Sequence, residues 1–262
     1  MKKTIFHQKL KIIRIEKLGK RYFRFAFESP DISSAAVPGQ FVEIKTVESD
    51  QPLLRRPLGI HRVKGKVFGC LCEIVGKGTE LLSKRKVGDY LDVIGPLGNG
   101  FNYKFSGRKI TKLPIIVAGG IGVAPLLFLA DKTVKLKPLV LIGAKTKDQI
   151  TCEKEFKDLG CSVKIATDDG SRGFKGYISK LLEKELRIQG AKPGIIYACG
   201  PKPMLKEIAK VAHKYKVPAE VSLEEHMACG IGACLGCVVD TKDGLKRVCK
   251  EGPVFKAEEI IW

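Results

Sequence analysis

A short stretch of the sequence joins an apolar strand to a helix through closely spaced glycines: Val117-Ala118-Gly119-Gly120-Ile121-Gly122-Val123-Ala124-Pro125. Pro125 suits the first turn of a helix, where its missing N–H group leaves no hydrogen bond unmade. Glycines let the backbone approach a ligand closely, and the N–H groups at a helix N-terminus attract phosphate. The stretch therefore predicts a nucleotide-binding turn with Gly119, Gly120 and Gly122 at a diphosphate. A tight turn with a purely structural role is the alternative.

The sequence around this stretch alternates between strands and helices. We expect strands at 113–118, 138–144, 162–167 and 194–199, and helices at 125–133, near 152–159, at 177–186 and at 203–214. Such alternation is typical of a doubly wound α/β domain with a parallel sheet. We assign residues 107–220 to this domain, and Ser106-Gly107 to the linker before it.

A second strand-to-helix turn in this domain has the sequence Tyr197-Ala198-Cys199-Gly200-Pro201-Lys202-Pro203-Met204. In an open α/β sheet both turns lie at the carboxyl edge of the strands, where ligands bind. We therefore expect Cys199, Gly200 and Pro201 to lie near the same ligand as the first turn. A buried structural thiol is the alternative for Cys199, because free cysteines are commonly core residues.

Residues 1–106 predict β-structure. Apolar and polar residues partly alternate over 9–15 and 22–27, and further strands are expected at 41–44 and 66–75. Several short strands at this spacing predict an antiparallel sandwich or barrel. Strong turn chemistry over 95–100 is expected to end the region.

Two segments of this region are candidates for binding an anion. Leu54-Arg55-Arg56-Pro57-Leu58-Gly59-Ile60 places a permanently charged guanidinium beside a rigid proline. Gly76-Lys77-Gly78-Thr79-Glu80-Leu81-Leu82-Ser83 predicts a glycine loop capped by Thr79 into a short helix. Each segment alone is better explained as a structural turn, and it is their joint occurrence that indicates a nucleotide site.

The last segment, residues 221–262, contains four cysteines: Cys229, Cys234, Cys237 and Cys249. Their spacing is C-x4-C-x2-C with eleven residues before the fourth, which is the pattern of plant-type 2Fe-2S ligands. We expect Gly230, Gly232 and Gly236 to let the loop wrap the cluster, since glycine adopts positive φ easily. A structural zinc site is one alternative, although zinc favours repeated short C-x2–4-C pairs. Buried thiols without a metal are the other.

Composition narrows the class of protein. The chain has 262 residues, of which 44% are hydrophobic and 29% charged, as expected for a globular protein with more than one domain. No apolar run reaches the ~18 residues of a membrane helix, and no signal peptide is evident, so we predict a cytoplasmic protein that does not bind membranes. The net charge of +19 is spread along the chain. It favours a solvated lysine-rich surface or an acidic partner over nucleic acid.

Taken together, these motifs resemble the ferredoxin–NADP reductase superfamily. The resemblance extends over nearly the whole chain to the electron-transfer subunits of class 1B dihydroorotate dehydrogenases. It is carried by five segments: Arg56-Pro57-Leu58-Gly59, Gly78-Thr79, Thr167-Asp168-Asp169-Gly170-Ser171, Cys199-Gly200-Pro201 and Met227-Ala228-Cys229-Gly230-Ile231-Gly232-Ala233-Cys234.

This resemblance implies a mixed fold with an antiparallel β-barrel that binds FAD, an α/β domain that binds NAD, and a small iron–sulfur domain. The FAD-binding residues implied by the resemblance are Arg56, Pro57, Leu58, Gly59, Leu71, Cys72, Glu73, Gly76, Gly78 and Thr79. The chain departs from the superfamily at Leu58 and Gly59, where a tyrosine and a serine or threonine are usual. NAD is expected at Gly119, Gly120 and Gly122, with its nicotinamide near Cys199 and Gly200.

Asp168, which follows a predicted strand, favours NAD over NADP because an acid there repels the 2′-phosphate. An ordinary turn aspartate is the alternative, and Lys145 and Arg172 would accept that phosphate.

The resemblance also implies a partner subunit, and it leaves alternative functions open. The partner is an FMN-containing catalytic subunit of dihydroorotate dehydrogenase, in a heterotetramer of two plus two that serves pyrimidine biosynthesis. An NAD(P)H–ferredoxin reductase, or a sulfide dehydrogenase or hydrogenase diaphorase subunit, is the alternative within the same plan. The alternative that is not an enzyme is a nucleotide-binding adaptor stapled by zinc.

Overall fold

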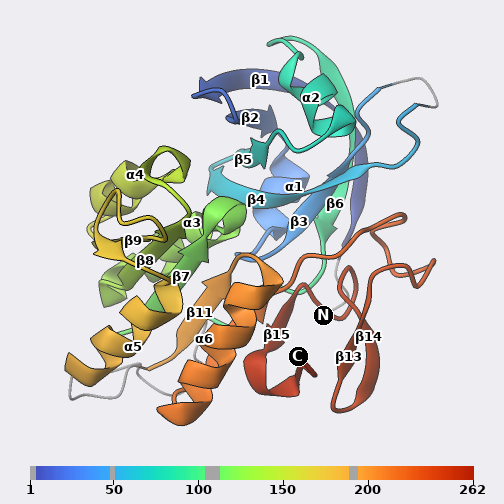
Figure 1. Cartoon of the computed structure of the whole chain (residues 1–262). Helices are drawn as coiled ribbons and strands as arrows, with labels where there is room; N and C mark the ends of the chain where they lie inside the picture. Colours follow the sequence, from blue (N-terminus) through green and yellow to red (C-terminus); the bar gives the residue numbers. More distant parts are fainter. Residues whose placement is uncertain (1–3, 48–50, 104–112, 189–193) are drawn as a thin grey trace.

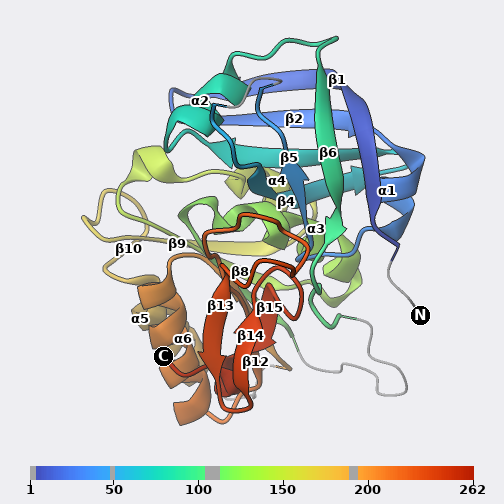
Figure 2. The same cartoon turned by 90° about the vertical axis from the view of Figure 1, so that its right-hand side faces the viewer.

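The computed structural model describes residues 4–47, 51–103, 113–188 and 194–262. Within these residues the N-terminal region forms a closed barrel with the strand order β1-β2-β5-β4-β3-β6, in which the paired strands are antiparallel (Figures 1 and 2). The strands are β1 (Phe6–Leu18), β2 (Tyr22–Glu28), β3 (Phe41–Ile44), β4 (Arg56–Lys64), β5 (Val67–Glu73) and β6 (Tyr90–Leu97). The prediction of a sandwich or barrel is thus resolved as a barrel.

The barrel interior is filled by aromatic and branched side chains. Phe23, Phe25 and Phe27 of β2 are all buried, and Phe27 lies beside Phe68 of β5 with ring centroids 5.3 Å apart. Two short helices, α1 (Pro30–Ala35) and α2 (Lys77–Ser83), connect the strands. Aromatic side chains bury large apolar areas, so this cluster is a major source of the barrel's stability.

Two sequence-based expectations for the barrel are wrong. The segment from Arg56 to Ile60 is part of strand β4, which pairs with β3, and is not an isolated turn. The turn expected over 95–100 begins later, because Gly95, Pro96 and Leu97 still belong to β6. Every strand of a closed barrel pairs with a neighbour on each side. This pairing holds turn-forming residues at the end of a strand in an extended conformation, which their local propensity does not predict.

The second region is a sheet that the described residues form in the order β10-β9-β8-β7-β11-β12-β15. Its strands are β7 (Ile115–Gly119), β8 (Leu139–Ala144), β9 (Ser162–Thr167), β10 (Phe174–Lys175), β11 (Ile196–Cys199), β12 (Ala219–Ser222) and β15 (Val254–Lys256). The pairs from β10 to β12 are parallel, and β15 is antiparallel to β12. The α/β architecture predicted from the alternation is therefore confirmed.

Helices cover both faces of this sheet. They are α3 (Val123–Thr133), α4 (Glu153–Asp158), α5 (Ile178–Ile188) and α6 (Lys202–Lys214). Ile115 and Val117 belong to the core that contains α5 and α6, whereas Ile116 and Ala118 belong to the core that contains α3 and α4. Because successive strand residues point to opposite faces, the two helix pairs lie on opposite sides of the sheet (Figure 1).

The cysteine segment is joined to this sheet. It contains a hairpin of β13 (Val238–Thr241) and β14 (Gly244–Arg247), followed by β15 at the sheet edge (Figure 2). Cys237 and Cys249 are buried in the same core as α5 and α6. The boundary predicted between residues 220 and 221 falls within β12, and the boundary at 106–107 lies outside the described residues, as does the proposed linker.

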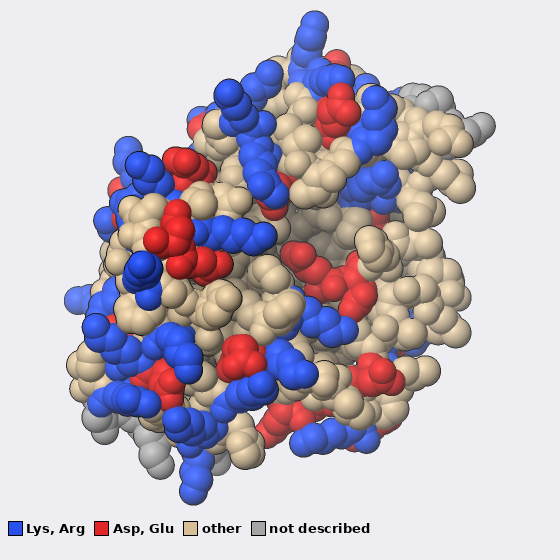
Figure 3. Space-filling view, in the orientation of Figure 1, with Lys and Arg blue, Asp and Glu red and all other residues tan. Residues whose placement is uncertain are grey.

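Among the described residues, no helix combines the length and apolarity needed to cross a bilayer. The face shown in Figure 3 carries Lys and Arg side chains interspersed with Asp and Glu.

Candidate redox site

A cavity of about 500 Å³ lies where the barrel, the α/β region and the cysteine segment meet. Figure 3 shows a hollow in the surface between the barrel and the rest of the molecule. The cavity is lined from the barrel by Gly39, Phe41, Arg56, Pro57, Leu58, Gly59, Leu71, Cys72, Glu73, Val75 and Thr79. It is lined from the other regions by Ile121, Ala124, Pro125, Cys199, Ser222, Leu223, Glu224, Glu225, His226, Met227 and Pro253.

Most residues proposed for FAD lie together on the side of the cavity that the barrel forms. Strand β4 contributes the run from Arg56 to Gly59, and its neighbour β5 contributes Leu71, Cys72 and Glu73. Gly59 also lies against Pro125 at the start of α3, where an added Cβ would be 3.5 Å from Pro125 Cδ. A flat ring could therefore lie against β4 and β5 and still reach the α/β region.

The loop before α2 supports the same wall. Gly76 and Gly78 do not line the cavity, but Gly78 lies beneath the Arg56 side chain. Thr79 does line it, and its Oγ1 accepts hydrogen bonds from the N–H groups of Val75 and Gly76 at 3.0 and 3.2 Å. Gly76 is the N-cap residue, so the expectation that Thr79 itself caps the helix is wrong; Thr79 bonds back to the cap from the first turn.

The two glycine turns of the α/β region pack against each other. Gly119 ends β7, residues Gly120–Gly122 form a single 3-10 turn, and α3 begins at Val123. An added Cβ on Gly122 would lie 2.2 Å from the carbonyl oxygen of Cys199. Gly119 is equally close to the second turn, because a Cβ there would meet Met204 Sδ at 2.4 Å. Glycine is needed at both positions to bring the turns together.

The residues proposed for NAD occupy the carboxyl edge of the sheet. Cys199 lines the cavity, whereas Gly119, Gly120, Gly122, Asp168, Gly200 and Pro201 lie outside its lining. Asp168 follows β9, its side chain is exposed, and its N–H donates to the carbonyl of Ala144 at 3.0 Å. Cys199 is buried, and burial raises the pKa of its thiol, so this side chain is a neutral thiol.

Sequence reasoning missed the third wall of the cavity, which is the run from Ser222 to Met227. His226 is one of its residues, and its side chain is exposed. The pKa of Glu224 is raised, first by the surrounding protein atoms and second by the negative charge of Glu73. The Glu224 side chain nevertheless reaches solvent. A usable signal was the polar Glu224-Glu225-His226 run directly after β12, at the edge of the sheet where ligands bind.

The four cysteines form two neighbouring pairs. The side chains of Cys229 and Cys234 interact, as do those of Cys237 and Cys249. The hairpin explains the second pair, because Cys237 directly precedes β13 and the N–H of Cys249 donates to Cys237 Sγ at 3.4 Å. Cys237 and Cys249 are buried, and Cys234 is exposed.

The four thiols of this segment are candidate metal donors. A tetrahedral structural zinc would need four donors around one centre, whereas a 2Fe-2S cluster is held by four thiolates divided between two irons. The pairing of the cysteines therefore fits the cluster.

The backbone of the cysteine loop favours the thiolate form of Cys229. Burial opposes ionisation of Cys229, but backbone hydrogen bonds from Cys234, Ile231 and Ala233 lower its pKa to about 6. The thiolate is the form that binds iron. Gly230 and Gly232 have positive φ, as expected, whereas the third left-handed residue is Leu235 and not Gly236.

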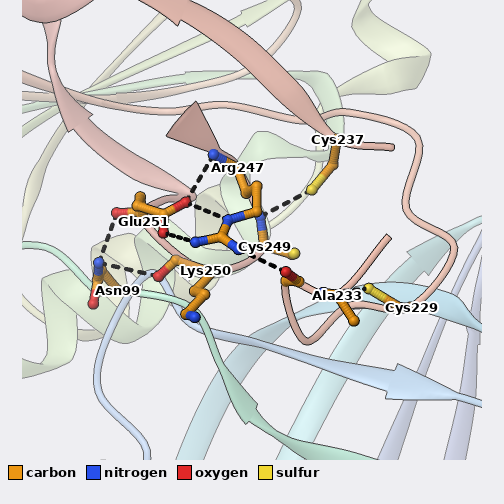
Figure 4. A network of polar contacts seen from close by, with 9 residues as sticks. Asn99, Cys229, Ala233, Cys237, Arg247, Cys249, Lys250 and Glu251 are labelled. Atoms are coloured by element: carbon orange, nitrogen blue, oxygen red, sulfur yellow. Dashed lines mark hydrogen bonds and ion pairs between the residues drawn. The ribbon is translucent and has the colours of Figure 1, made fainter. Parts of the chain in front are cut away.

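A polar network fixes the cysteine loop to the end of the hairpin (Figure 4). Arg247 donates from Nη1 to the carbonyl of Gly232 at 2.7 Å and from Nε to Glu251 at 2.9 Å. Hydrogen bonding to Arg247 lowers the pKa of Glu251 to about 2. Asn99, just beyond the last barrel strand, donates to the carbonyl of Glu251 at 2.6 Å. The network thus links the loop to the barrel.

Comparison with known proteins identifies two domains. Residues 224–261 match the family described as the iron–sulfur cluster binding domain of dihydroorotate dehydrogenase B, and residues 116–210 match the oxidoreductase NAD-binding domain. The chain is 42% identical over 261 residues to the dihydroorotate dehydrogenase B (NAD(+)) electron transfer subunit of Desulforamulus reducens, covering 96% of this chain and 97% of the relative. The subunit of Geobacillus sp. WCH70 is 37% identical over 97% of this chain and 98% of its own length.

The chain belongs to the family of dihydroorotate dehydrogenase B electron transfer subunits. It is an oxidoreductase subunit with FAD, a 2Fe-2S cluster and NAD as its redox groups, as predicted. A solved NADH-dependent reduced ferredoxin–NADP oxidoreductase, studied for flavin-based electron bifurcation, is 33% identical with a TM-score of 0.82, covering 97% of this chain and 90% of the other. The cytochrome b5 reductase-containing region of human Ncb5or, 20% identical with a TM-score of 0.65 and covering 80% and 67%, shares the fold.

Proposed function

We propose that this electron transfer subunit passes electrons between NAD(H) and an FMN-containing catalytic subunit of dihydroorotate dehydrogenase, with FAD in the cavity and the 2Fe-2S cluster on the four cysteines. The full-length match to subunits named for that enzyme supports the partner. We further propose an assembly of two such subunits with two catalytic subunits. The cytoplasmic location remains a prediction from the sequence.

One observation carries the proposal: the cavity wall runs directly into the cluster loop. Met227 lines the cavity, and Cys229 follows two residues later. Two residues of chain span at most ~7 Å. The proposed flavin site and the first cluster ligand are therefore adjacent by covalent connection, which short-range electron transfer requires.

The protein's own groups bind and orient the carriers. A bound flavin accepts two electrons as hydride and releases them singly, which is what joins NAD chemistry to a one-electron cluster. Arg56 provides a permanent positive charge at the cavity for a diphosphate. Gly120, where an added Cβ would meet nothing within 4 Å, leaves the start of α3 open to the diphosphate of NAD. The cavity-facing Cys199 is where the nicotinamide would meet the flavin.

Co-expression with the catalytic subunit tests this function. We expect the two subunits to copurify, the partner to contain FMN, and the pair to reduce NAD with dihydroorotate while neither subunit does so alone. A partner-free chain that already oxidises dihydroorotate, or a catalytic subunit that reduces NAD without this chain, would contradict the proposal.

A second candidate function is an NADH–ferredoxin reductase subunit. The 33% identity and nearly complete coverage of the solved NADH-dependent ferredoxin–NADP oxidoreductase favour it. The two functions differ in a simple assay: the second predicts that the purified subunit reduces ferredoxin with NADH at rates that added catalytic subunit does not raise.

A further inference from the structure

Glu43 is a carboxyl group buried between the barrel and the cluster loop. It lies on β3 with an exposed fraction of 0%. Neither carboxyl oxygen has a hydrogen-bond partner within the described part of the chain. The pairing of β3 with β6 is irregular between Phe41 and Glu43, and such irregularities re-aim side chains. A buried polar side chain without a partner is rare and calls for an explanation.

The side chain of Glu43 is in contact with the cluster loop at Gly230. A Cβ added to Gly230 would lie 2.4 Å from Glu43 Cγ and 2.7 Å from Glu43 Oε1. Gly230 has a φ of +66° and directly follows Cys229. The loop can therefore rest on Glu43 only because residue 230 has no side chain.

The cations near Glu43 are bonded to other groups. Arg55 donates from Nη1 to the carboxylate of Asp92 at 2.9 Å and to its carbonyl at 3.0 Å. Arg56 donates from Nη1 to the carbonyl of Leu54 at 2.6 Å. Neither guanidinium hydrogen-bonds to Glu43, so its carboxyl group is left facing the cluster loop.

We propose that Glu43 is a positioning residue for the iron–sulfur centre: its buried polar group, which has no hydrogen-bond partner among the described residues, lies against the loop beside Cys229 and would hydrogen-bond to that loop when the cluster is bound. Hydrogen bonds at the sulfurs of a cluster stabilise its reduced, more negative form and raise its potential. Glu43 also faces Pro57 across the β3–β4 pair, and Pro57 lines the cavity. One side chain thus ties the strand beside the proposed flavin site to the first cluster ligand.

The inference rests on the proposed assignment of the four cysteines to the cluster. The test distinguishes a failure of the Glu43 role from a failure of that assignment. The full-length subunit, loaded with FAD and iron, is compared with Glu43→Gln, which keeps a neutral donor, and Glu43→Met, which keeps volume without one. Glu185→Gln is the matched control, because Glu185 is also buried but bonds to Lys164 on the far side of the α/β region. The readouts are iron per chain and the cluster midpoint potential from an EPR-monitored redox titration.

We expect Glu43→Gln and Glu185→Gln to keep the wild-type iron content and potential. Glu43→Met should shift the reduction equilibrium of the cluster against the reduced form by about tenfold, which lowers the midpoint potential by ~59 mV for a one-electron couple. Loss of iron binding in Glu43→Met, with iron retained in Glu43→Gln, supports the same role. Equal potentials in all proteins, or a shift in Glu43→Gln as large as in Glu43→Met, would overturn it. Wild-type protein without iron would instead refute the cluster assignment.

Discussion

The guanidinium of Arg56 occupies the space that a side chain at Gly78 would need. A Cβ built on Gly78 would lie 2.2 Å from Arg56 Nε and 2.5 Å from its Cζ. The position of the Arg56 charge at the cavity therefore depends on the absence of a side chain at residue 78. This contact links β4 to α2 through two residues that are 22 positions apart in the sequence.

The variant Gly78→Ala should displace Arg56 and weaken FAD binding by about tenfold, or ~1.4 kcal/mol. Lys84→Ala is the control, because the Lys84 side chain at the end of α2 is exposed, bonds to Glu80 and does not line the cavity. Flavin fluorescence titration of the FAD-stripped chain gives both dissociation constants. Equal affinity in the two variants would remove Arg56 from the flavin site.

Gly122→Ala should weaken NADH binding while leaving FAD in place. The new methyl group would press on the Cys199 carbonyl and separate the two glycine turns. We expect the NADH concentration that half-saturates flavin reduction to rise about tenfold, as measured by stopped-flow absorbance. Lys84→Ala again serves as the control. Loss of bound FAD in Gly122→Ala would show that this turn belongs to the flavin site instead.

Replacing Cys234 with alanine should abolish the cluster but not flavin reduction. Cys234 is exposed, so the substitution removes a proposed ligand without opening the core. Iron per chain should fall by at least half, whereas NADH should bleach the flavin at the wild-type rate. Cys161→Ala, a buried thiol outside the cysteine segment, should keep both properties. If bleaching is lost in folded Cys234→Ala, the proposed order of carriers is wrong.

His61 makes the stability of the fold depend on pH. It is buried, its Nδ1 donates to the carbonyl of Ala124 at 3.1 Å, and burial lowers its pKa to about 4. Because the folded pKa lies below the unfolded value of ~6.5, the unfolded chain binds the proton more readily. Stability is full above pH ~6.5 and falls as the pH decreases toward 4.

Between pH 7 and pH 5 this linkage removes about 2 kcal/mol from the free energy of unfolding. The variant His61→Asn retains an N–H donor but does not titrate, so its melting temperature should fall less over the same range. Thermal melts of both proteins at the two pH values provide the comparison. Parallel pH dependence in wild type and variant would show that His61 does not titrate on unfolding.

Local sequence was a good guide where short-range patterns decide the structure. The strand at 162–167 was predicted with its observed bounds, and helix α3 starts only two residues before the predicted position. The cysteine spacing and the glycine turns depend on bond geometry within a few residues. The assignments of individual residues to FAD and NAD remain predictions, as does the division into three domains.

The sequence by itself determined the kinds of unit present: a β-rich region, a parallel α/β region and a loop of four cysteines, because periodicity, turn chemistry and ligand spacing are local properties. Only the tertiary structure decided how they meet. Extended pairing made a strand of Arg56–Lys64, strand addition attached β15 to the α/β sheet, and packing placed Glu43 beneath Gly230 and the run 222–227 on the cavity wall. These contacts join residues far apart in the chain, so no local pattern encodes them.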